Sequence, residues 1–518
     1  MTRLPLILSV IAIAILTLVP VFVYQGEMTG DAPHRLVIVT PHNEQIRYEF
    51  GLGFSRWHQQ KYGAPVAVDW STPGGTSEIR RMLVAQYEAD LRQGAEIGGD
   101  ADILFGGGSY EFNALSRKLT VKVGNEERST RVLDECAWMS DARLAELFGE
   151  NTIDGQPLYD KDRRWFGVAL STFGIVADGT LCAQLGVPAP TTWEALADPR
   201  LFGHVALVNP AQSGSVATAF ETILQRLGWT RGWQVLRRTA ANSNQILAAS
   251  SRVPTSVGNG ESAAGIAIDF YGRYQAQSLA DEAGIAGDPS IARLTFVAPE
   301  GQSVVDADPV AILRGAPNGE VARRFVEFCL SDEGQLLWQL AAGDGSACGA
   351  PRPAVYTLRR LPARRAAYEC CLPCFVDQVN PFAQQAPLTS NPDFRDFVSP
   401  LFVAMAVNNA HALRTAWERV FTHPAYPPGG GIVSASDVSD PHLRSLLEAF
   451  DAMPIVRGPN DATLNLDDPS QRSAVRAGWM RRGFKESELW SAREDPMTLL
   501  RREFTAFFHH SYYAVLHR

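Results

Sequence analysis

Small and hydroxyl-bearing residues follow several predicted strands of this sequence, and they are its best candidates for binding chemistry. Residues 204–220 predict a buried strand, a short loop and the first turns of a helix, with Ser213, Gly214 and Ser215 at the junction. The first turn of a helix leaves about four backbone N–H groups without partners, at the positive end of the helix dipole. These residues therefore suit an anionic ligand, although either serine could instead serve only as a helix cap.

Loops of similar composition follow four more predicted strands. Ligands of open α/β sheets bind outside the carboxyl ends of the strands, where these loops would meet. Backbone N–H groups of glycine-rich loops can surround phosphoryl oxygens, and polar side chains can orient the rest of a solute. The candidate ligand-binding residues in these loops are His42, Gly75, Thr76, Ser77, Gly107, Gly108, Ser109, Asp269 and Tyr271. The alternatives are a surface or capping role for His42, a helix N-cap for Asp269 and packing between lobes for Tyr271.

Strands and helices alternate along the chain, which predicts an α/β fold. Apolar strand patterns at 35–40, 65–70 and 101–109 are separated by segments with helical spacing. The long apolar run at 165–178 is suited to cross between two lobes, and strand patterns between 292 and 315 lead back. This order predicts a two-lobed protein whose lobes are joined by two crossing segments.

The composition is that of a soluble globular protein preceded by one apolar segment. The 518 residues carry a net charge of −9 without a basic block, which argues against nucleic acid as a partner. Residues 4–24 carry no charge and would span about 31 Å as a helix, enough to cross a bilayer. We expect this segment to anchor the protein to the inner membrane, with a cleaved secretory signal as the alternative. Either outcome places the body outside the cytoplasm, in the periplasm.

The sequence lacks the motifs of the main hydrolase and nucleotide-binding classes, and we expect no enzyme activity. A membrane-tethered ligand sensor is an alternative of another class, but no signalling domain is recognisable. Seven cysteines include a C-x-x-C at 371–374. A local disulfide or plain thiols are favoured there over a metal site, because no second ligand pair accompanies the motif.

Six segments follow one another in a recognisable order between about residues 35 and 345. They are VIVTPHNE, ADILFGGGS, FGVALSTFGIVADGTL, GVPAPTTWEALADPRLFGHVALVNPAQSGS, NGESAAGIAIDFYG and ADPVAILRGAPNGEVARRFVEFCLSDEGQ. Together they resemble the extracellular solute-binding proteins of ABC importers, of the type II periplasmic-binding fold. The resemblance is to the branch named for ferric iron, which also takes phosphorylated and phosphonate solutes. It implies a clamshell that closes on a small-molecule or ion ligand and delivers it to an ABC-transporter permease.

The ferric members of that family hold their metal through a histidine, a carboxylate and two adjacent tyrosines. The resemblance places the tyrosine pair at Phe270 and Tyr271 and the carboxylate among glycines 106–108, so two anionic ligands are missing. The histidine position falls near His42 or Glu44, which adds Glu44 to the ligand-binding candidates. His42, Glu44 and Tyr271 are thus weak metal candidates. We expect no resident cofactor and a phosphorylated or phosphonate solute, with iron or chelated iron as alternative cargo.

The expected organisation has five parts. They are a signal anchor and linker at 1–30, the first part of lobe 1 at 35–170, lobe 2 at 171–300, a return to lobe 1 at 301–350 and a mainly helical C-terminal extension at 351–518. The sequence of the extension indicates no chemistry. His509 and His510 are adjacent and would point to different faces of a helix, which disfavours them as a metal pair.

Overall fold

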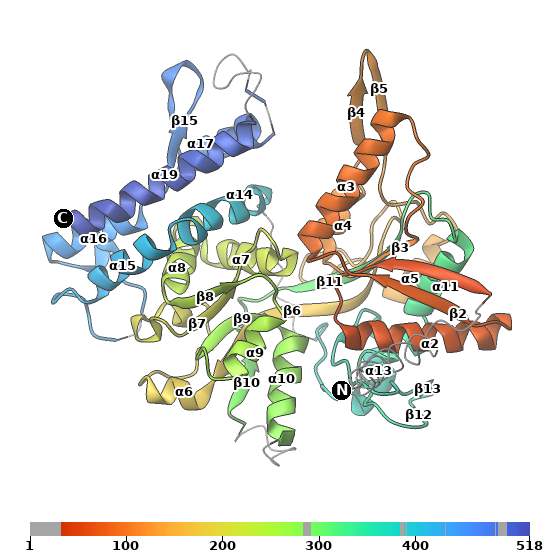
Figure 1. The fold of residues 1–518 in the computed structure, drawn as a ribbon. Coiled ribbons are helices and arrows are strands. Elements are labelled where there is room, and N and C mark those ends of the chain that lie inside the picture. The colour runs from red at the N-terminus through yellow and green to blue at the C-terminus, as the bar shows by residue number, and fades with distance from the viewer. Residues whose placement is uncertain are drawn as a thin grey trace, which may run out of the picture.

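The computed structural model describes residues 33–282, 292–383, 388, 391–429, 431–481, 483–484 and 495–518. The apolar segment 4–24, which we expect to be a membrane anchor, lies outside these residues. Within the described ranges, no helix combines the length and the apolar character needed to cross a bilayer. The described chain forms two α/β lobes that share one mixed sheet (Figure 1).

Lobe 1 is built on four strands and the helices that connect them. Its main elements are β1 (His34–Val39), α2 (Glu44–Tyr62), β2 (Val66–Ser71), α3 (Thr76–Gln93), β3 (Ile103–Phe105), α4 (Ser109–Leu115), α5 (Asp141–Phe148), β11 (Val305–Ile312) and α11 (Gly319–Cys329). The strand order is β2-β1-β3-β11, with β1 parallel to both neighbours and β11 antiparallel to β3. α2 begins after Asn43, whose side chain accepts the Ile46 N–H, and it buries Phe50 and Phe54 at the predicted spacing.

One strand, β6 (Phe166–Asp178), belongs to both lobes. Its first half pairs with β11, whereas its second half, from Phe173 onward, pairs with β9 (Ala264–Ile268) and β10 (Leu294–Val297). All of its residues except Thr172 are buried, as the predominantly apolar sequence requires. The run at 165–178 therefore crosses between the lobes, as predicted.

Lobe 2 continues the sheet beyond β6 in the order β9-β7-β8. Its elements are β7 (Val205–Val208), α7 (Gly214–Leu227), α8 (Trp229–Ala241), β8 (Ser243–Leu247), α9 (Arg252–Gly258), β9, α10 (Asp269–Glu282) and β10. β7 is parallel to both neighbours, so the loops after β7 and β8 leave the sheet at the same edge. The predicted strand, loop and helix at 204–220 correspond to β7, its following loop and the start of α7.

The chain after residue 350 divides between the two lobes. Its elements are β14 (Leu361–Pro362), α13 (Arg365–Cys371), α14 (Pro392–Phe402), α15 (Ala410–Phe421), α16 (Pro441–Asp451), β15 (Ile455–Arg457), β16 (Thr463–Asn465), α17 (Pro469–Val475) and α19 (Pro496–His517). β14 pairs with the lobe 1 half of β6 and α13 packs on α5, whereas α14 and α15 pack on α7 and α8. The region predicted as one extension at 351–518 is thus two units. Residues 391–518 are called the C-terminal segment below.

The cysteines of the C-x-x-C motif form disulfides with other partners and not with each other. Cys374 is bonded to Cys348, and Cys371 is bonded to its neighbour Cys370. The remaining cysteines, Cys136, Cys182 and Cys329, are buried thiols.

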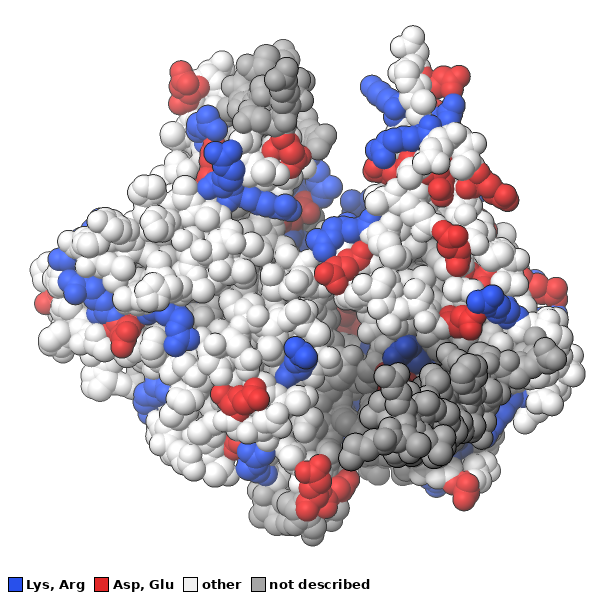
Figure 2. Space-filling model, in the orientation of Figure 1, with Lys and Arg blue, Asp and Glu red and all other residues white. Residues whose placement is uncertain are grey.

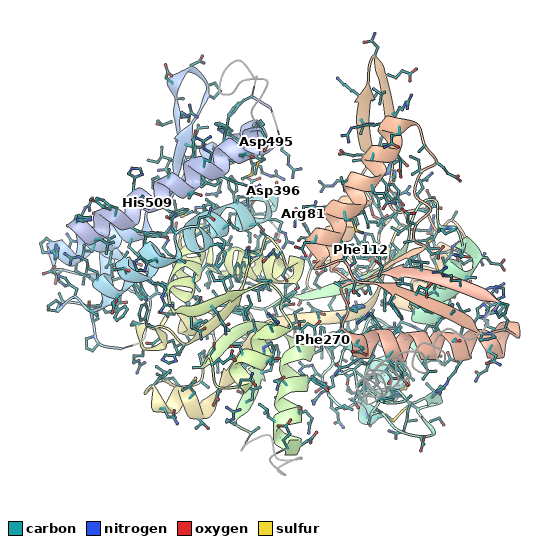
Figure 3. All side chains as sticks on the ribbon, viewed as in Figure 1. Arg81, Phe112, Phe270, Asp396, Asp495 and His509 are labelled. Carbon is teal, nitrogen blue, oxygen red and sulfur yellow. A yellow bond between two sulfur atoms is a disulfide. The ribbon has the colours of Figure 1, made fainter. Side chains whose placement is uncertain are left out.

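A gap separates lobe 1 from the C-terminal segment on one side of the molecule. The lobe 1 wall carries α3 and the projecting hairpin of β4 (Leu119–Val123) and β5 (Glu126–Thr130). Figure 2 shows Lys and Arg side chains on both walls of this gap. In Figure 3, Arg81 of α3 and Asp396 of α14 lie on its facing sides. The C-terminal segment therefore extends the lobe 2 side toward lobe 1.

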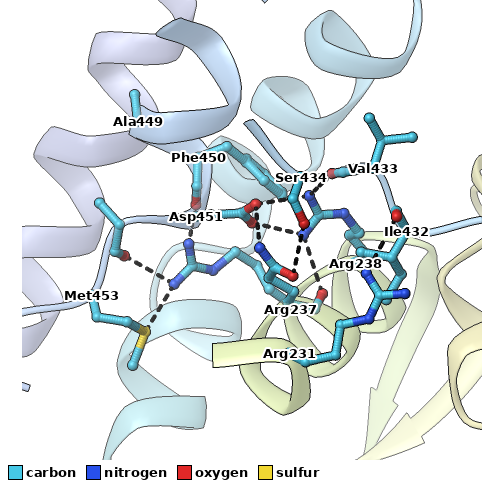
Figure 4. A network of polar contacts seen from close by, with 12 residues as sticks. Arg231, Arg237, Arg238, Ile432, Val433, Ser434, Ala449, Phe450, Asp451 and Met453 are labelled. Atoms are coloured by element: carbon cyan, nitrogen blue, oxygen red, sulfur yellow. Dashed lines mark hydrogen bonds and ion pairs between the residues drawn. The ribbon is translucent and has the colours of Figure 1, made fainter. Parts of the chain in front are cut away.

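Buried arginines of α8 hold the C-terminal segment on lobe 2 (Figure 4). Arg238 forms a two-pronged ion pair with Asp451 at 2.6 and 2.9 Å, and its side chain is fully buried. The Arg238 guanidinium also donates to the Val433 carbonyl at 2.9 Å. Arg237 donates to the Phe450 and Ala452 carbonyls. A buried guanidinium is stable only when it is fully paired, so these contacts specify how the segment docks.

We predict that Asp451→Ala lowers the free energy of unfolding by about 3–5 kcal/mol, because it leaves the Arg238 charge buried without its carboxylate. Urea unfolding followed by circular dichroism measures the change. The matched control is Glu503→Ala, which removes the partner of Arg457, a residue whose side chain is 63% exposed. That variant should lose about 1 kcal/mol or less. Equal losses in the two variants would contradict the assignment of Arg238 as the anchor of the segment.

Candidate functional site

A cavity of about 350 Å³ lies between the lobes, at the carboxyl ends of β1, β2, β3, β7 and β8. The start of α10 and residues of β6 and β11 complete its wall. Phe270, labelled in Figure 3, lies between the lobes in this region. The residues predicted from the sequence that line the cavity are His42, Gly75, Thr76, Gly107, Gly108, Ser213, Ser215 and Tyr271.

The centre of the site is a buried ion pair between Arg360 and Asp308. The side chains of Arg360 and Asp308 are 3% and 8% exposed. The Arg360 guanidinium also donates to Ser171 Oγ at 2.6 Å and lies 4.3 Å from the Phe270 ring. Asp308 receives the Gly107 N–H at 2.6 Å and contacts His42 Nε2 at 2.8 Å. Four parts of the chain that are distant in sequence therefore meet at one carboxylate.

The surroundings keep Asp308 charged and His42 neutral. Burial acts to raise the pKa of Asp308, but Arg360, His42 and the Gly107 N–H outweigh it and hold that pKa well below its usual range. Burial lowers the pKa of His42. His42 Nε2 also lies 3.0 Å from the Arg360 guanidinium, so this one nitrogen contacts both members of the ion pair. Neither His42 Nδ1 nor Arg360 Nε has a hydrogen-bond partner among the described residues, although both are buried.

A second carboxylate, Asp306, enters the cavity from β11. Its oxygens accept the Ser109 hydroxyl at 2.6 Å and the Ser109 N–H at 3.3 Å. Burial raises the pKa of Asp306 to about 6, although these hydrogen bonds act in the opposite direction. The cavity lining thus holds one cation, Arg360, the carboxylates of Asp308 and Glu78, and the carboxyl group of Asp306, which titrates near neutral pH.

Several backbone N–H groups predicted to receive an anion already have acceptors. Gly107 donates to Asp308 and Ser109 donates to Asp306. The Gly75 N–H is bound by the side chain of Glu78 at 3.0 Å, and the Gly214 N–H donates to Thr76 Oγ1 at 3.0 Å. Among the described residues, the N–H groups of Thr76 and Ser215 have no acceptor. The N–H of Gly108, in the glycine loop after β3, likewise has no acceptor among the described residues, and Gly108 lines the cavity. The donors open to a solute are therefore at the starts of α3 and α7 and at this one position of the glycine loop.

Gly214 and Gly75 lie where the two lobes touch. A Cβ atom on Gly214 would lie 2.4 Å from Thr76 Oγ1 and 2.8 Å from Glu111 Oε1 of lobe 1. A Cβ atom on Gly75 would lie 2.5 Å from the Gln212 carbonyl of lobe 2. No larger residue fits without displacing a lobe, so the absence of side chains here permits closure. Gly214 was predicted to line the ligand site, but its backbone faces lobe 1.

The other predicted residues lie outside the cavity wall. Ser77 donates to Glu111 at 2.8 Å, and Asp269 is fully buried and accepts the Phe270 N–H at 2.9 Å. Ser109 is held by Asp306, as described above. Glu44 begins α2 and lines a second cavity of about 330 Å³, which shares Tyr271 with the first.

The metal candidates do not form a ligand set. Burial raises the pKa of Tyr271 to about 12, which disfavours a phenolate, and His42 is already bound to Asp308. Glu44 lies in the second cavity. Within the described ranges, no three His, Cys, Asp or Glu side chains are grouped so as to hold a metal ion. His509 and His510 line only an exposed groove with Asn408 and Arg501, among others.

The sequence analysis missed the three charged residues of the site. Asp306 and Asp308 occupy the otherwise apolar strand VDADPVAI, and two carboxylates inside a buried strand are a signal that could have been used. Arg360 has no comparable signal, because it is one of several arginines in a basic stretch. Its selection depends on β14, which places it beside β6.

Comparison with known proteins identifies the central part of the chain. Residues 142–354 match the family described as bacterial extracellular solute-binding protein, which confirms the resemblance over these residues. Over 170 residues, 33% of this chain and 39% of the relative, the sequence is 29% identical to the phosphoglycerate transport regulatory protein PgtC of Salmonella typhimurium. Over 241 residues, 46% of this chain and 61% of the relative, it is 27% identical to an uncharacterized protein of Haemophilus influenzae. The matches thus span between 39% and 61% of these relatives.

Similar folds occur among solved periplasmic binding proteins. AfuA of Actinobacillus pleuropneumoniae, with fructose-6-phosphate bound, is 19% identical, with a TM-score of 0.48 over 74% of this chain and 98% of that one. Iron-bound HitA of Pseudomonas aeruginosa is 17% identical, with a TM-score of 0.47 over 70% of this chain and 95% of that one.

We predict that Asp306 makes the stability of the protein depend on pH between about 4 and 7. Its native pKa of about 6 lies above the usual value of 3.8, so the native state binds this proton more tightly than the unfolded state does. Ionisation of Asp306 therefore destabilises the native state. This effect is absent below the usual pKa of 3.8 and is complete above the native pKa of about 6. Relative to Asp306→Asn, the parent should therefore lose about 1–3 kcal/mol of unfolding free energy between pH 4.5 and 7.5. Urea unfolding at both pH values measures this difference.

Asp308→Asn is the control. The pKa of Asp308 is lowered, so its ionisation stabilises the native state, whereas ionisation of Asp306 destabilises it. The stability that this carboxylate contributes is fully present above its usual pKa and is lost only as the pH falls below that value. The difference between the parent and Asp308→Asn should therefore be nearly constant between pH 4.5 and 7.5. A flat difference for Asp306→Asn as well would show that Asp306 does not titrate in this range.

Proposed function

We propose that this chain is the solute-binding component of an ABC import system and that the cavity between its lobes captures a small solute carrying an oxyanion. The single observation that carries the proposal is Arg360, a buried cation that lines the cavity and whose side chain is 3% exposed. A planar guanidinium suits a phosphoryl or phosphonate group. The free N–H groups of Thr76 and Ser215 lie at the starts of two helices, where backbone donors also favour an anion.

The acidic side of the cavity suits the remainder of such a solute. Asp306 and Asp308 are acceptors for hydroxyl groups, and the neutral His42 ring lines the same wall. Tyr271 supplies an aromatic surface and a neutral hydroxyl. A volume of about 350 Å³ is at the lower end of ligand cavities, which favours a small phosphorylated polyol or acid. The relative named for phosphoglycerate transport supports the same class of solute.

The proposed role in import also implies where the protein acts and with which partner. It would act in the periplasm, deliver its solute to an ABC permease and be held at the inner membrane by residues 4–24. Ferric iron is the alternative solute, and the experiment below compares it with phosphoryl compounds. Arg360 places a positive charge where a bound cation would need negative ligands.

We predict that phosphoglycerate or fructose 6-phosphate binds, whereas glycerate and fructose, which lack the phosphoryl group, do not. Isothermal titration calorimetry of the purified protein measures the four affinities, and ferric citrate tests the iron alternative. Arg360→Met should weaken phosphoryl binding by about ten- to a hundredfold, because it removes hydrogen bonds to a charged group. The matched control is Arg364→Met, since Arg364 is paired with Asp332 outside the cavity wall. Tight ferric binding without any phosphoryl binding would overturn the proposal.

We predict that the two serines at the start of α7 have separable roles. Ser213 caps the helix by accepting the Val216 N–H at 3.4 Å, so Ser213→Ala should cost about 1 kcal/mol of stability. Ser215 lines the cavity from the first turn of the helix, where its hydroxyl contacts Ser213 Oγ at 3.0 Å. Ser215→Ala should therefore weaken phosphoryl binding about tenfold with little change in stability. Calorimetry and thermal melting of both variants distinguish the two roles. An unchanged affinity for the phosphoryl compound in Ser215→Ala would show that Ser215 does not bind the solute.

A further inference from the structure

Arg395 of the C-terminal segment contacts both lobes at the edge of the cavity. It lies on α14, and its side chain is 6% exposed. On the lobe 2 side it donates to the Gly214 carbonyl at 3.2 Å and to Thr218 Oγ1 at 3.1 Å. On the lobe 1 side its guanidinium lies 4.0 Å from the ring of Tyr110. One buried cation thus joins α7, α4 and α14.

The lobe 2 contacts of Arg395 fix the helix start that lines the cavity. The Gly214 carbonyl accepts from Arg395, while the N–H of the same residue donates to Thr76 of lobe 1. Glu221, about two turns further along α7 than Gly214, lies 3.5 Å from the guanidinium. Arg395 is therefore held on lobe 2 in either state of the cleft. Only its contact with Tyr110, a residue of lobe 1, depends on the lobes being closed.

We propose that Arg395 is a positioning residue that stabilises the closed cleft through the face of Tyr110. A guanidinium over an aromatic ring gains more when the cation is desolvated, and the Arg395 side chain is buried here. Opening would separate the ring from the cation and expose both to water. The C-terminal segment would thereby set the balance between open and closed forms. The inference concerns closure itself and holds for any solute that the cavity accepts.

The opposite side of the cleft has a contact of the same kind. Arg359 is held by Asp377 on the lobe 1 side and donates to Gln277 of α10 at 3.2 Å. Arg395 and Arg359, which both follow residue 350, thus each make a contact between the lobes.

Spin labels on two hairpins can report closure directly. Asn125 is exposed in the turn between β4 and β5 of lobe 1, and Thr463 is exposed in β16 of the C-terminal segment. These two hairpins project on opposite sides of the gap (Figure 1). In an Asn125→Cys, Thr463→Cys protein, pulsed electron resonance would measure the distance between the labels. The thiols of Cys136, Cys182 and Cys329 are buried and should not react under native conditions.

Tyr110→Leu keeps apolar bulk but removes the ring face. In the labelled full-length protein without added solute, we expect the ratio of short to long distances to fall about three- to tenfold. Tyr110→Phe, which retains the ring, should restore the parent ratio. Urea unfolding confirms that each variant is folded to the same extent.

The matched control is Tyr62→Leu. The Tyr62 ring also lies 4.0 Å from a guanidinium, that of Arg324, but both residues belong to lobe 1. This variant should leave the distance ratio unchanged. An unchanged ratio in Tyr110→Leu, or an equal fall in Tyr62→Leu, would overturn the role proposed for Arg395. Because no solute is used, either result is independent of whether the protein binds phosphoryl compounds.

Discussion

The buried pair of Arg360 and Asp308 is the interaction on which the rest of the site depends. Transfer of two charges from water into a protein interior is unfavourable, and their attraction offsets this cost only with good geometry and additional hydrogen bonds. Here the additional partners are His42, Ser171 and the Gly107 N–H. These residues come from the ends of β1 and β3 and from β6. Satisfying the pair therefore requires that all of these elements be in register around the cavity.

This pair also explains the charge pattern of the cavity. A lone arginine would make the site a simple anion receptor, but Asp308 neutralises much of its charge and Asp306 adds a group that titrates near pH 6. The carboxylates also occupy N–H groups of the loop after β3, which removes them as anion donors. An oxyanion is then favoured near Arg360, the start of α7 and the Gly108 N–H, whereas the start of α3 also carries the carboxylate of Glu78, which lines the cavity. A solute with one anionic end and one hydroxyl-bearing end matches this separation of charge.

The sequence was sufficient to predict much of the fold and part of the site. The ends of the strands and the strand that crosses between the lobes were predictable, because each depends on a local apolar pattern. The buried run of β6 is an example. His42 and Ser215, which line the cavity, could be placed near strand ends from the sequence because only short loops separate them from β1 and β7. Gly214 was misplaced because its neighbour is Thr76, a contact between residues 138 positions apart. Arg360 was missed for the same reason, since its partner Asp308 lies 52 positions away.

The chain after residue 350 is part of the binding unit, and its contacts explain its length. One portion adds β14 to the shared strand and thereby places Arg360 on the cavity wall. The other is fixed on α8 through the buried Arg238 and Asp451, and this rigid attachment lets Arg395 hold the start of α7. A loosely tethered domain could not supply buried cations, because a guanidinium that leaves water needs fixed partners that offset its loss of hydration. The two lobes alone would lack both the cation of the cavity and the support of one of its helix starts.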